Sequence, residues 1–516
     1  MTVAFSDGKR NLWCGIAAAV SALLLWAAYP PHSETLAILV ALVPMLVVVR
    51  LASPKRAALV FFLFGFLFWV LSLSWMPAII KNNGPWPLVL LGWFALAAAC
   101  AGYMALFGFG AAWLWRRRER VRHRALFAIM CLFAEAGLWA LIEYLRATLF
   151  TGFAWNFLGT AFAALPSFAT PARFGGVYLV SALVVLLNGV FATLFLRVFA
   201  PVLGVGEEIP SRSRLVGRLV QIAETGLPLA FILACLCVGN RIVRDEAART
   251  AAPTYLRVAL VQRNAPCCFK PGKRENAYEA FGQLLDVAAA AKPDLVVLAE
   301  SAMSEFGAVR SFRAQDVARD FLKRASAKLL MAGGDDVVSN RTYNAVALYT
   351  PDGEAEGGLR AVYHKQHLVP FGEYIPFDKW ITPLQKLSPV GVSLHPGEPT
   401  LFTVEVGGRA LKIAPLICYE DTDPALAAKA KKMGADLIVL VTNDSWFSNS
   451  AEAEAHTAQA VLRAVETGLP IVRVGNSGVT GVIRPDGTAR WLSDDAGRLL
   501  VDAPGILLET VAVPAH

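Results

Sequence analysis

The sequence predicts a chain of two parts: an N-terminal all-α bundle of membrane-spanning helices and a C-terminal α/β domain. Of its 516 residues, 56% are apolar and 17% are charged, whereas soluble domains are about half apolar and about a quarter charged. Between residues 11 and 49 only Glu34 is charged, and no residue is charged from 57 to 80 or from 82 to 115. After about residue 250 the charges return, and short apolar strands alternate with helical stretches.

The predicted membrane half contains seven apolar stretches, each near the length of about 20 residues that a helix needs to cross roughly 30 Å of hydrocarbon. They are 12–29, 35–52, 57–76, 88–115, 125–146, 175–197 and 219–240. The first is not expected to be a cleaved signal peptide, because Pro30-Pro31 leads directly into the next apolar run. The last is the weakest candidate, because Glu224 and Pro228 interrupt it.

Lys and Arg residues in the connecting segments predict the orientation of this bundle. The N-terminus and the second, fourth and sixth connections hold fourteen of them, whereas the other connections hold two, Lys81 and Arg173. Positive charge marks the cytoplasmic side of a membrane. We therefore expect a cytoplasmic N-terminus, and an odd number of spans would place the C-terminal domain on the outer face.

Several kinds of site are not indicated. The net charge of +8 arises from the basic connections, and no basic stripe interleaved with aromatic residues suggests a nucleic-acid partner. The eight cysteines include no CxxC pair, so neither a zinc site nor a disulfide framework is expected. His364 and His367 have no carboxylate cluster beside them in the sequence, and His456 is expected to be a structural histidine. We therefore predict no metal and no cofactor.

One connection in the membrane half is unusually aromatic. Residues 149–160 include Trp155 and directly follow Glu143 and Arg146, which lie at the end of a predicted span. The segment could be an interfacial aromatic belt. It could instead contact lipid, with Arg146 holding a lipid phosphate, since ionisable residues in spans are candidates for function. The sequence favours neither interpretation.

The polar half predicts a layered α/β domain. Strands are expected at 256–262, 294–299, 328–331, 410–417, 436–442 and 470–474, and helices at 276–291, 316–326, 424–433 and 452–467. In such sheets the chemistry lies just beyond the carboxyl ends of strands. Glu300 and Cys418 each follow an apolar strand, and Lys365 lies in the sequence between them.

Together these three side chains form a set suited to acyl transfer. A thiol has an ordinary pKa of about 8.5 and needs a base or a cation nearby to become a nucleophilic thiolate. Glu300 would accept the proton of Cys418, and the ammonium of Lys365 would stabilise the oxyanion of a tetrahedral intermediate. Each residue alone also has an ordinary explanation, because a Cys after a strand is commonly buried, and Glu and Lys are commonly on the surface.

The flanking residues carry a resemblance to known proteins. Residues 254–516 resemble the nitrilase (carbon–nitrogen hydrolase) superfamily, which uses Glu, Lys and Cys in this chain order, and the whole chain resembles the bacterial apolipoprotein N-acyltransferase family. The most specific matches run from Lys365 to Glu373 and from Cys418 through Tyr419 to Glu420. Other matching residues are Glu300-Ser301, Thr342-Tyr343-Asn344, Asn443-Asp444, Trp446-Phe447, His456, Arg463, Glu466, Pro470, Arg473, Asn476, Gly478 and the Thr-Gly-Phe-Ala-Trp segment that ends at Trp155.

The resemblance implies a multi-domain fold, with an all-α transmembrane helix bundle over residues 1–245 and a nitrilase-like αββα sandwich over residues 254–516. It implies that Cys418 is the nucleophile, that Glu300 is the general base and that Lys365 stabilises the oxyanion. The supporting or substrate-binding residues that it implies or that the membrane half suggests are Glu373, Glu420, Tyr419, Asn344, Trp446, Arg146, Glu143 and Trp155.

The implied reaction transfers a fatty acyl chain from a phospholipid to the α-amine of the N-terminal diacylglyceryl-cysteine of an apolipoprotein. Cys418 would carry the acyl group as a thioester between the two substrates in a ping-pong mechanism. The enzyme would be a multi-pass monomer of the bacterial inner membrane, in contact with membrane lipids and with its catalytic domain on the periplasmic face. A site at the membrane avoids moving acyl chains into water, which would cost about 0.8 kcal/mol per CH₂.

Some features depart from the pattern of this family. Residues 263–268 lack its glycine and glutamine pattern, Ala154 stands where proline is usual, and no further membrane helix follows residue 513, so we expect the domain to be tethered from one side. Residues 374–397 form too long a stretch for a plain connection. This stretch is either a membrane-facing lid or a packed excursion on the surface.

Two alternative functions remain open on the sequence. A membrane-anchored amidase or nitrilase would use Glu300, Lys365 and Cys418 in the same way but would pass the acyl group to water. A non-catalytic scaffold for another lipid-pathway enzyme would form no thioester at Cys418. The long membrane half and the aromatic connection favour the acyltransferase, because a simple hydrolase needs neither.

Overall fold

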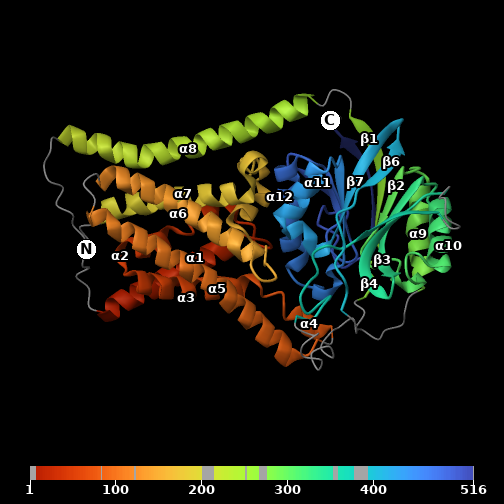
Figure 1. Cartoon of the computed structure of the whole chain (residues 1–516), viewed down its shortest axis with the longest axis horizontal. Coiled ribbons are helices and arrows are strands. Elements are labelled where there is room, and N and C mark those ends of the chain that lie inside the picture. The colour runs from red at the N-terminus through yellow and green to blue at the C-terminus, as the bar shows by residue number, and fades with distance from the viewer. Residues whose placement is uncertain are drawn as a thin grey trace. The chain divides into compact units, whose positions relative to one another are not determined.

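The computed structural model describes residues 7–82, 84–120, 124–199, 214–249, 253–266, 276–351, 358–376 and 393–514. These residues divide into two compact units. The first runs from Asp7 to Ile242 apart from Lys81 and Asn82, and the second comprises those two residues and the chain from Val243 onward. Figure 1 shows helices throughout the first unit and two sheets with flanking helices in the second.

The first unit is helical. Its helices, some of which extend into the second unit, are α1 (Asp7–Ala27), η1 (Thr35–Leu39), α2 (Val43–Leu51), α3 (Pro54–Ser72), α4 (Ala78–Lys81), α5 (Trp86–Arg116), η2 (Arg117–Arg120), α6 (Arg124–Thr148), η3 (Leu158–Ala164), η4 (Pro166–Phe168), α7 (Ala172–Phe199) and α8 (Arg214–Arg249). Among the described residues, six helices are long and apolar enough to cross a membrane: α1, α3, α5, α6, α7 and α8. The chain is therefore a multi-pass membrane protein.

The span expected at residues 35–52 is not one continuous helix. It consists of the short η1 and the nine-residue α2, and nine residues of helix extend only about 14 Å. Pro44 lies in the first turn of α2, where its missing N–H is tolerated. Asn188 on α7 holds the break, because its amide donates to the carbonyl of Ile38 at 3.0 Å and accepts from the N–H of Leu42 at 2.9 Å.

The segment of η1 and α2 nevertheless returns the chain to the end of the bundle from which α1 starts. The Arg56 guanidinium, near the start of α3, donates to the side-chain oxygen of Asn11, near the start of α1, at 3.1 Å. Because the 21 residues of α1 extend about 31 Å, the segment must cover a similar distance back. A broken helix is tolerated at this depth because protein groups satisfy its backbone. The segment therefore crosses the bundle in addition to the six long helices.

A buried ion pair joins two of these helices. The guanidinium of Arg50, at the end of α2, lies 3.2 Å from the carboxylate of Glu135 on α6, and both side chains are buried. The same guanidinium lies 4.4 Å from the centre of the Trp115 ring. A buried charge is tolerated only when it is paired in this way, so the pair fixes α2 against α6.

The second unit contains two six-stranded sheets. The strands are β1 (Thr254–Gln262), β2 (Leu295–Leu298), β3 (Leu329–Val338), β4 (Arg341–Tyr349), β5 (Leu359–His364), β6 (Phe402–Val406), β7 (Arg409–Ile417), β8 (Leu437–Thr442), β9 (Ile471–Gly475), β10 (Gly481–Ile483), β11 (Ala489–Trp491) and β12 (Gly505–Val513). One sheet has the order β12-β1-β2-β3-β4-β5 and the other has the order β11-β10-β9-β8-β7-β6. The strands β1, β2 and β3 are parallel, as are β7, β8 and β9.

Apolar packing arranges these sheets in four layers. Side chains of both sheets, such as Val258 and Val439, pack together in one core. Val296 on the other face of the first sheet packs with Phe281 and Phe321, which lie on α9 (Ala277–Ala289) and α10 (Phe312–Arg324). Figure 1 shows α11 (Pro424–Lys432) and α12 (Glu452–Thr467) beside the second sheet, on the side away from the first. The predicted αββα sandwich is therefore confirmed.

The strands and helices expected from the sequence of this unit are all present, with differences at their ends. The helix expected at 316–326 begins at Phe312, because the Ser311 hydroxyl caps it by accepting from the Ala314 N–H at 3.2 Å. The segment expected as a lid or surface excursion lies mostly outside the described residues, which omit 377–392. Cys267 and Cys268, in the departure from the family pattern, also lie outside them.

Candidate active site

A buried polar cluster lies at the carboxyl ends of β2 and β5. Lys365 directly follows β5 and its side chain is 1% exposed. Its Nζ donates to Glu373 Oε1 at 2.9 Å and lies 3.9 Å from Glu300 Oε1. Asn344 on β4 donates from Nδ2 to both carboxylates at 2.7 Å. Two carboxylates therefore share one ammonium and one amide, which fixes the position of all four groups.

Glycine on the neighbouring strand makes room for Glu300. The chain approaches Gly333 of β3 so closely that an added Cβ would lie 2.6 Å from the Cα of Glu300. The N–H of Gly333 donates to the carbonyl of Ala299, and its carbonyl accepts from Met303. The turn after β2 is thus bonded to β3, and it directs the Glu300 carboxylate toward Lys365.

Cys418 follows the buried strand β7 at a sharp turn. Its φ is 50°, a left-handed conformation that costs a residue with a side chain about 1 kcal/mol or more. The 3₁₀-helix η7 (Cys418–Thr422) starts at this residue, and the side chain is only partly buried. The charges of Glu300 and Lys365 both act on the thiol. The structure therefore brings together the three residues that the sequence singled out.

Burial and neighbouring charges set the protonation of this cluster. Burial raises the pKa of Glu300 to about 6, with a further contribution from the charge of Glu373 and an opposing one from Lys365. Burial lowers the pKa of Lys365, but the carboxylates of Glu373 and Glu300 outweigh it and raise that pKa, so the amine stays charged. Burial and the charge of Glu300 raise the pKa of the Cys418 thiol. The resting thiol is therefore protonated, and a carboxylate able to take the proton lies beside it.

Glu420 joins the turn of Cys418 to the loop of Lys365. Its buried carboxylate accepts the N–H of Ile417 at 2.7 Å, and it accepts those of Gln366 and His367 at 2.7 and 3.1 Å. The Tyr363 hydroxyl donates to the same carboxylate at 2.8 Å. Tyr363 was not predicted, because a tyrosine inside a strand carries no sequence signal of this contact. Glu420 is thus placed to position the nucleophile relative to the cation.

The expected pocket residues lie in neighbouring segments. The Tyr419 ring packs edge-on against the ring of His367, with centres 5.5 Å apart. Trp446 lies in η8 (Asp444–Phe447) after β8. The amide of Asn82, which belongs to the second unit, donates to the backbone carbonyl of Trp446 at 2.7 Å. No sequence pattern indicated this contact of Asn82.

The described C-terminal end of the 374–397 stretch is bonded to the site. The N–H of Leu394 donates to the carbonyl of Glu373 at 2.8 Å, and the N–H of Gly397 donates to the carbonyl of Lys365 at 2.8 Å. This end of the stretch is thus fixed at Lys365 and at Glu373, which pairs with it.

Glu143, Arg146 and Trp155 come together within the first unit. The Nη1 of Arg146 donates to the carbonyls of Phe153 and Trp155 at 2.6 and 2.8 Å. The Glu143 carboxylate accepts from the N–H of Leu158 at 2.8 Å. These side chains therefore hold the aromatic connection, and that use of Arg146 differs from the suggested contact with a lipid phosphate.

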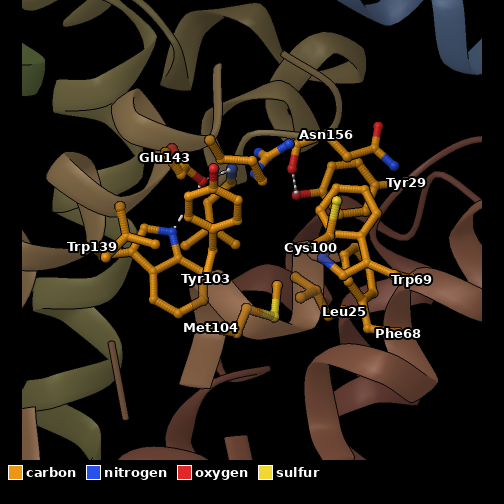
Figure 2. A pocket seen from close by; sticks show the side chains of 13 residues that line it. Leu25, Tyr29, Phe68, Trp69, Cys100, Tyr103, Met104, Trp139, Glu143 and Asn156 are labelled. Atoms are coloured by element: carbon orange, nitrogen blue, oxygen red, sulfur yellow. Dashed lines mark hydrogen bonds between the residues drawn. The ribbon is translucent and has the colours of Figure 1, made fainter. Parts of the chain in front are cut away.

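Glu143 and Arg146 border a small cavity in the helix bundle. Figure 2 shows the Trp139 ring directed at the Glu143 carboxylate, to which it donates at 2.9 Å, and the Tyr29 hydroxyl directed at the carbonyl of Asn156. The cavity has a volume of about 20 Å³, which is room for about one water molecule. It is too small for a lipid headgroup or an acyl chain.

The sandwich fold and the order Glu300, Lys365, Cys418 define the class of carbon–nitrogen hydrolases. Residues 257–503 match the family model described as carbon-nitrogen hydrolase. Residues 21–190 match the model of the apolipoprotein N-acyltransferase N-terminal domain.

Relatives from curated sequences match along most of the chain. The apolipoprotein N-acyltransferase of Allorhizobium ampelinum is 30% identical over 475 residues, 88% of this chain and 79% of its own. That of Geobacter metallireducens is 29% identical over 485 residues, 92% of this chain and 86% of its own. The chain belongs to the apolipoprotein N-acyltransferase family. Among solved structures, an amidase from Nesterenkonia sp. is 19% identical, with a TM-score of 0.37 over 51% of this chain and 92% of its own.

Proposed function

We propose that this enzyme transfers a fatty acyl chain from a phospholipid to the α-amine of an N-terminal diacylglyceryl-cysteine on a lipoprotein, through a thioester on Cys418. Its membership of the apolipoprotein N-acyltransferase family supports the overall reaction. The single observation that carries the mechanism is the buried pairing of Glu300 and Lys365 near the partly buried thiol of Cys418, which lies at a strained turn.

In the first half-reaction, Glu300 removes the proton of the thiol, and the Cys418 sulfur attacks the ester carbonyl of the phospholipid. Lys365 stabilises the oxyanion of the tetrahedral intermediate, since it remains charged in the cluster. The ester C–O bond then breaks, the protonated Glu300 returns the proton to the leaving alkoxide, and a lysophospholipid departs. A carboxyl with a pKa of about 6 can both accept and return a proton near neutral pH.

In the second half-reaction, the α-amine of the acceptor attacks the thioester carbonyl. Glu300 now takes a proton from the amine, Lys365 again stabilises the oxyanion, and the C–S bond breaks. The proton passes to the thiolate, so an amide product leaves and the free thiol of Cys418 is restored. No oxidant, metal or cofactor enters this balance.

The other predicted residues would position this machinery. Glu373 and Asn344 hold Lys365 and Glu300 at fixed positions, and Glu420 holds the turn of Cys418. Tyr419 and Trp446 would contact the substrates.

Residues of the membrane half would shape the surface that receives the lipids. Arg146 and Glu143 fix the connection that carries Trp155. Trp155 is buried, so it would support this surface from beneath, and Arg146 would hold the connection rather than a lipid phosphate.

The distribution of Lys and Arg supports an inner-membrane location with the N-terminus in the cytoplasm and the catalytic unit in the periplasm. The N-terminus and the connections expected in the cytoplasm hold fourteen Lys and Arg residues, whereas the connections expected on the outer face hold two. The contact between Arg56 and Asn11 places the starts of α1 and α3 at one end of the bundle, as this topology requires. Labelling of single cysteines introduced at residues 55 and 486 would test it: a membrane-impermeant maleimide applied to intact spheroplasts should modify only the second.

A two-substrate assay tests the transferase. Purified enzyme receives a phospholipid with a labelled acyl chain and a lipopeptide with an N-terminal diacylglyceryl-cysteine. We expect labelled N-acylated lipopeptide and lysophospholipid in equal amounts. A free fatty acid as the acyl product, with the lipopeptide unchanged, would identify a hydrolase instead. A lipopeptide whose α-amine is acetylated is the matched control and should accept nothing.

A further inference from the structure

A buried histidine behind Cys418 lies between two carboxylates. His456 lies on α12 and its side chain is 2% exposed. Its Nε2 is 2.9 Å from Asp421 Oδ1 and its Nδ1 is 3.1 Å from Asp444 Oδ1. Asp421 belongs to η7, the turn that Cys418 begins, and Asp444 begins η8 after β8. One imidazole ring thus joins the nucleophile's turn to the loop of the neighbouring strand.

The charges of this cluster balance only if the ring is an imidazolium. Burial lowers the pKa of His456, but Asp421 and Asp444 outweigh it and raise that pKa well above its ordinary value. The guanidinium of Arg473 on β9 lies 3.3 Å from Asp444 Oδ2. Burial and the charge of Asp444 raise the pKa of Glu452 to about 8, so its carboxyl is neutral at pH 7. The negative charges of Asp421 and Asp444 are therefore balanced by the positive charges of His456 and Arg473.

The cluster also has the composition of a metal site, but its geometry favours an ion-pair network. Asp444, Glu452 and His456 offer ligand atoms within 4.8 Å of one another. A metal would need a neutral imidazole with a free nitrogen, whereas both nitrogens of this ring face carboxylate oxygens. The guanidinium of Arg473 lies 3.3 Å from the other carboxylate oxygen of Asp444 and already supplies a positive charge to this carboxylate.

A threonine hydroxyl links this network to the nucleophile. Thr442, the last residue of β8, donates to Asp444 Oδ1 at 2.8 Å. Burial raises the pKa of the Cys418 thiol, and the Thr442 hydroxyl opposes this rise. A hydroxyl has one proton to donate, so Asp444 and a thiolate at Cys418 compete for it. Because His456 and Arg473 already bond to Asp444, that carboxylate competes less strongly.

We propose that His456 is a positioning residue for acyl transfer: as an imidazolium it clamps Asp421 to Asp444, holds the turn of Cys418, and offsets the negative charge that a thiolate would otherwise meet. This inference rests on the proposed role of Cys418 as the nucleophile. The sequence alone predicted only a structural role for His456, because its two partners lie in other elements of the fold.

Two substitutions should shift the thiol in opposite directions. His456→Gln removes one of the two positive charges beside Asp444 and leaves it paired with Arg473 alone of these two, so the apparent pKa of the Cys418 thiol should rise. Asp444→Asn removes the negative charge that opposes the thiolate, so this pKa should fall. A shift of about one unit is expected in each direction, which changes the thiolate fraction about tenfold below the pKa. A purely structural role of the network would not give shifts of opposite sign.

The measurement is the rate of alkylation of Cys418 by iodoacetamide as a function of pH, in the full-length protein in detergent. Mass spectrometry of the peptide that contains Cys418 separates it from the other cysteines. Glu454→Gln is the matched control, because Glu454 lies on α12 and its partly exposed carboxyl has no contact with the network in the described structure. Thermal melting of each variant reports its folding, and His456→Asn replaces His456→Gln if the latter does not fold.

The proposal predicts opposite shifts in the two variants and none in the control. It is overturned if both variants shift the thiol pKa in the same direction, or if neither shifts it, in folded protein. A stoichiometric metal that is retained through purification and lost in His456→Gln would overturn it as well. A different result would contradict the proposed function. If Cys418→Ala still transferred acyl chains, Cys418 would not be the nucleophile, whatever the alkylation rates of the wild-type thiol are.

Discussion

The pKa of Glu300 should set the pH below which thioester formation slows. Its pKa of about 6 leaves about a tenth of the carboxyl ionised at pH 5 and about nine-tenths ionised at pH 7. Only the ionised form can accept the thiol proton. The rate of thioester formation should therefore rise about tenfold between these two values of pH.

Glu373→Gln should lower the pKa of Glu300 and so allow thioester formation at lower pH. The substitution removes a negative charge that raises the pKa of Glu300, and it frees Lys365, now 2.9 Å from Glu373 and 3.9 Å from Glu300, to interact with Glu300. Both effects favour the ionised carboxylate. A fall of about one unit, to a pKa of about 5, would leave half of the base ionised at pH 5. The ratio of the rates at pH 7 and pH 5 should then fall from about ten to about two, although both rates should be lower because Lys365 loses a positioning partner.

The assay is single-turnover acylation of the enzyme by phospholipid in detergent micelles, quenched with acid and followed by intact-protein mass spectrometry. Glu405→Gln is the control, because Glu405 is exposed on β6 and should keep the wild-type ratio. An unchanged ratio in Glu373→Gln, or a midpoint that moves to higher pH, would refute the assignment of Glu300 as the base whose charge Glu373 opposes.

Two further predictions concern the helix bundle. Glu135→Gln leaves the buried guanidinium of Arg50 without its counter-charge and should destabilise the protein by about 3 kcal/mol, measured by thermal unfolding in detergent; an unchanged melting temperature would contradict this. Arg146→Gln removes the charge-assisted hydrogen bonds to the carbonyls of Phe153 and Trp155. It should increase deuterium uptake at residues 150–160 without changing uptake in the second unit, and equal uptake in both proteins would show that Arg146 does not hold this connection.

Much of the fold follows from apolar patterning. Strands such as β2 and β8 are continuous apolar runs because the sandwich buries both of their faces, and their ends are marked by the first polar residue. The break between η1 and α2 could not be predicted, because it depends on Asn188, which follows it by 146 positions and satisfies its backbone. A hydropathy pattern records how apolar a segment is, but not which distant side chain bonds to it.

The residues of the candidate site likewise fall into those that the sequence could predict and those that it could not. Glu300 and Cys418 could be predicted because each directly follows a strand, and Lys365 because its flanking residues are specific. Tyr363 and His456 could not be assigned their contacts, because their partners come from other elements of the fold.

Glu135 pairs with a residue that is far from it in the sequence, since Arg50 lies 85 positions away on α2. The burial of both side chains, which makes this pairing necessary, becomes apparent only in the folded bundle.

The most direct measurement of the central claim is the mass of the intact enzyme after incubation with phospholipid and no acceptor. We predict the addition of one acyl chain on the peptide that contains Cys418, and its loss when a diacylglyceryl lipopeptide is added. Cys418→Ala should show no adduct and no product while melting like the wild type. Acylation of another residue, or transfer by Cys418→Ala, would contradict the thioester mechanism.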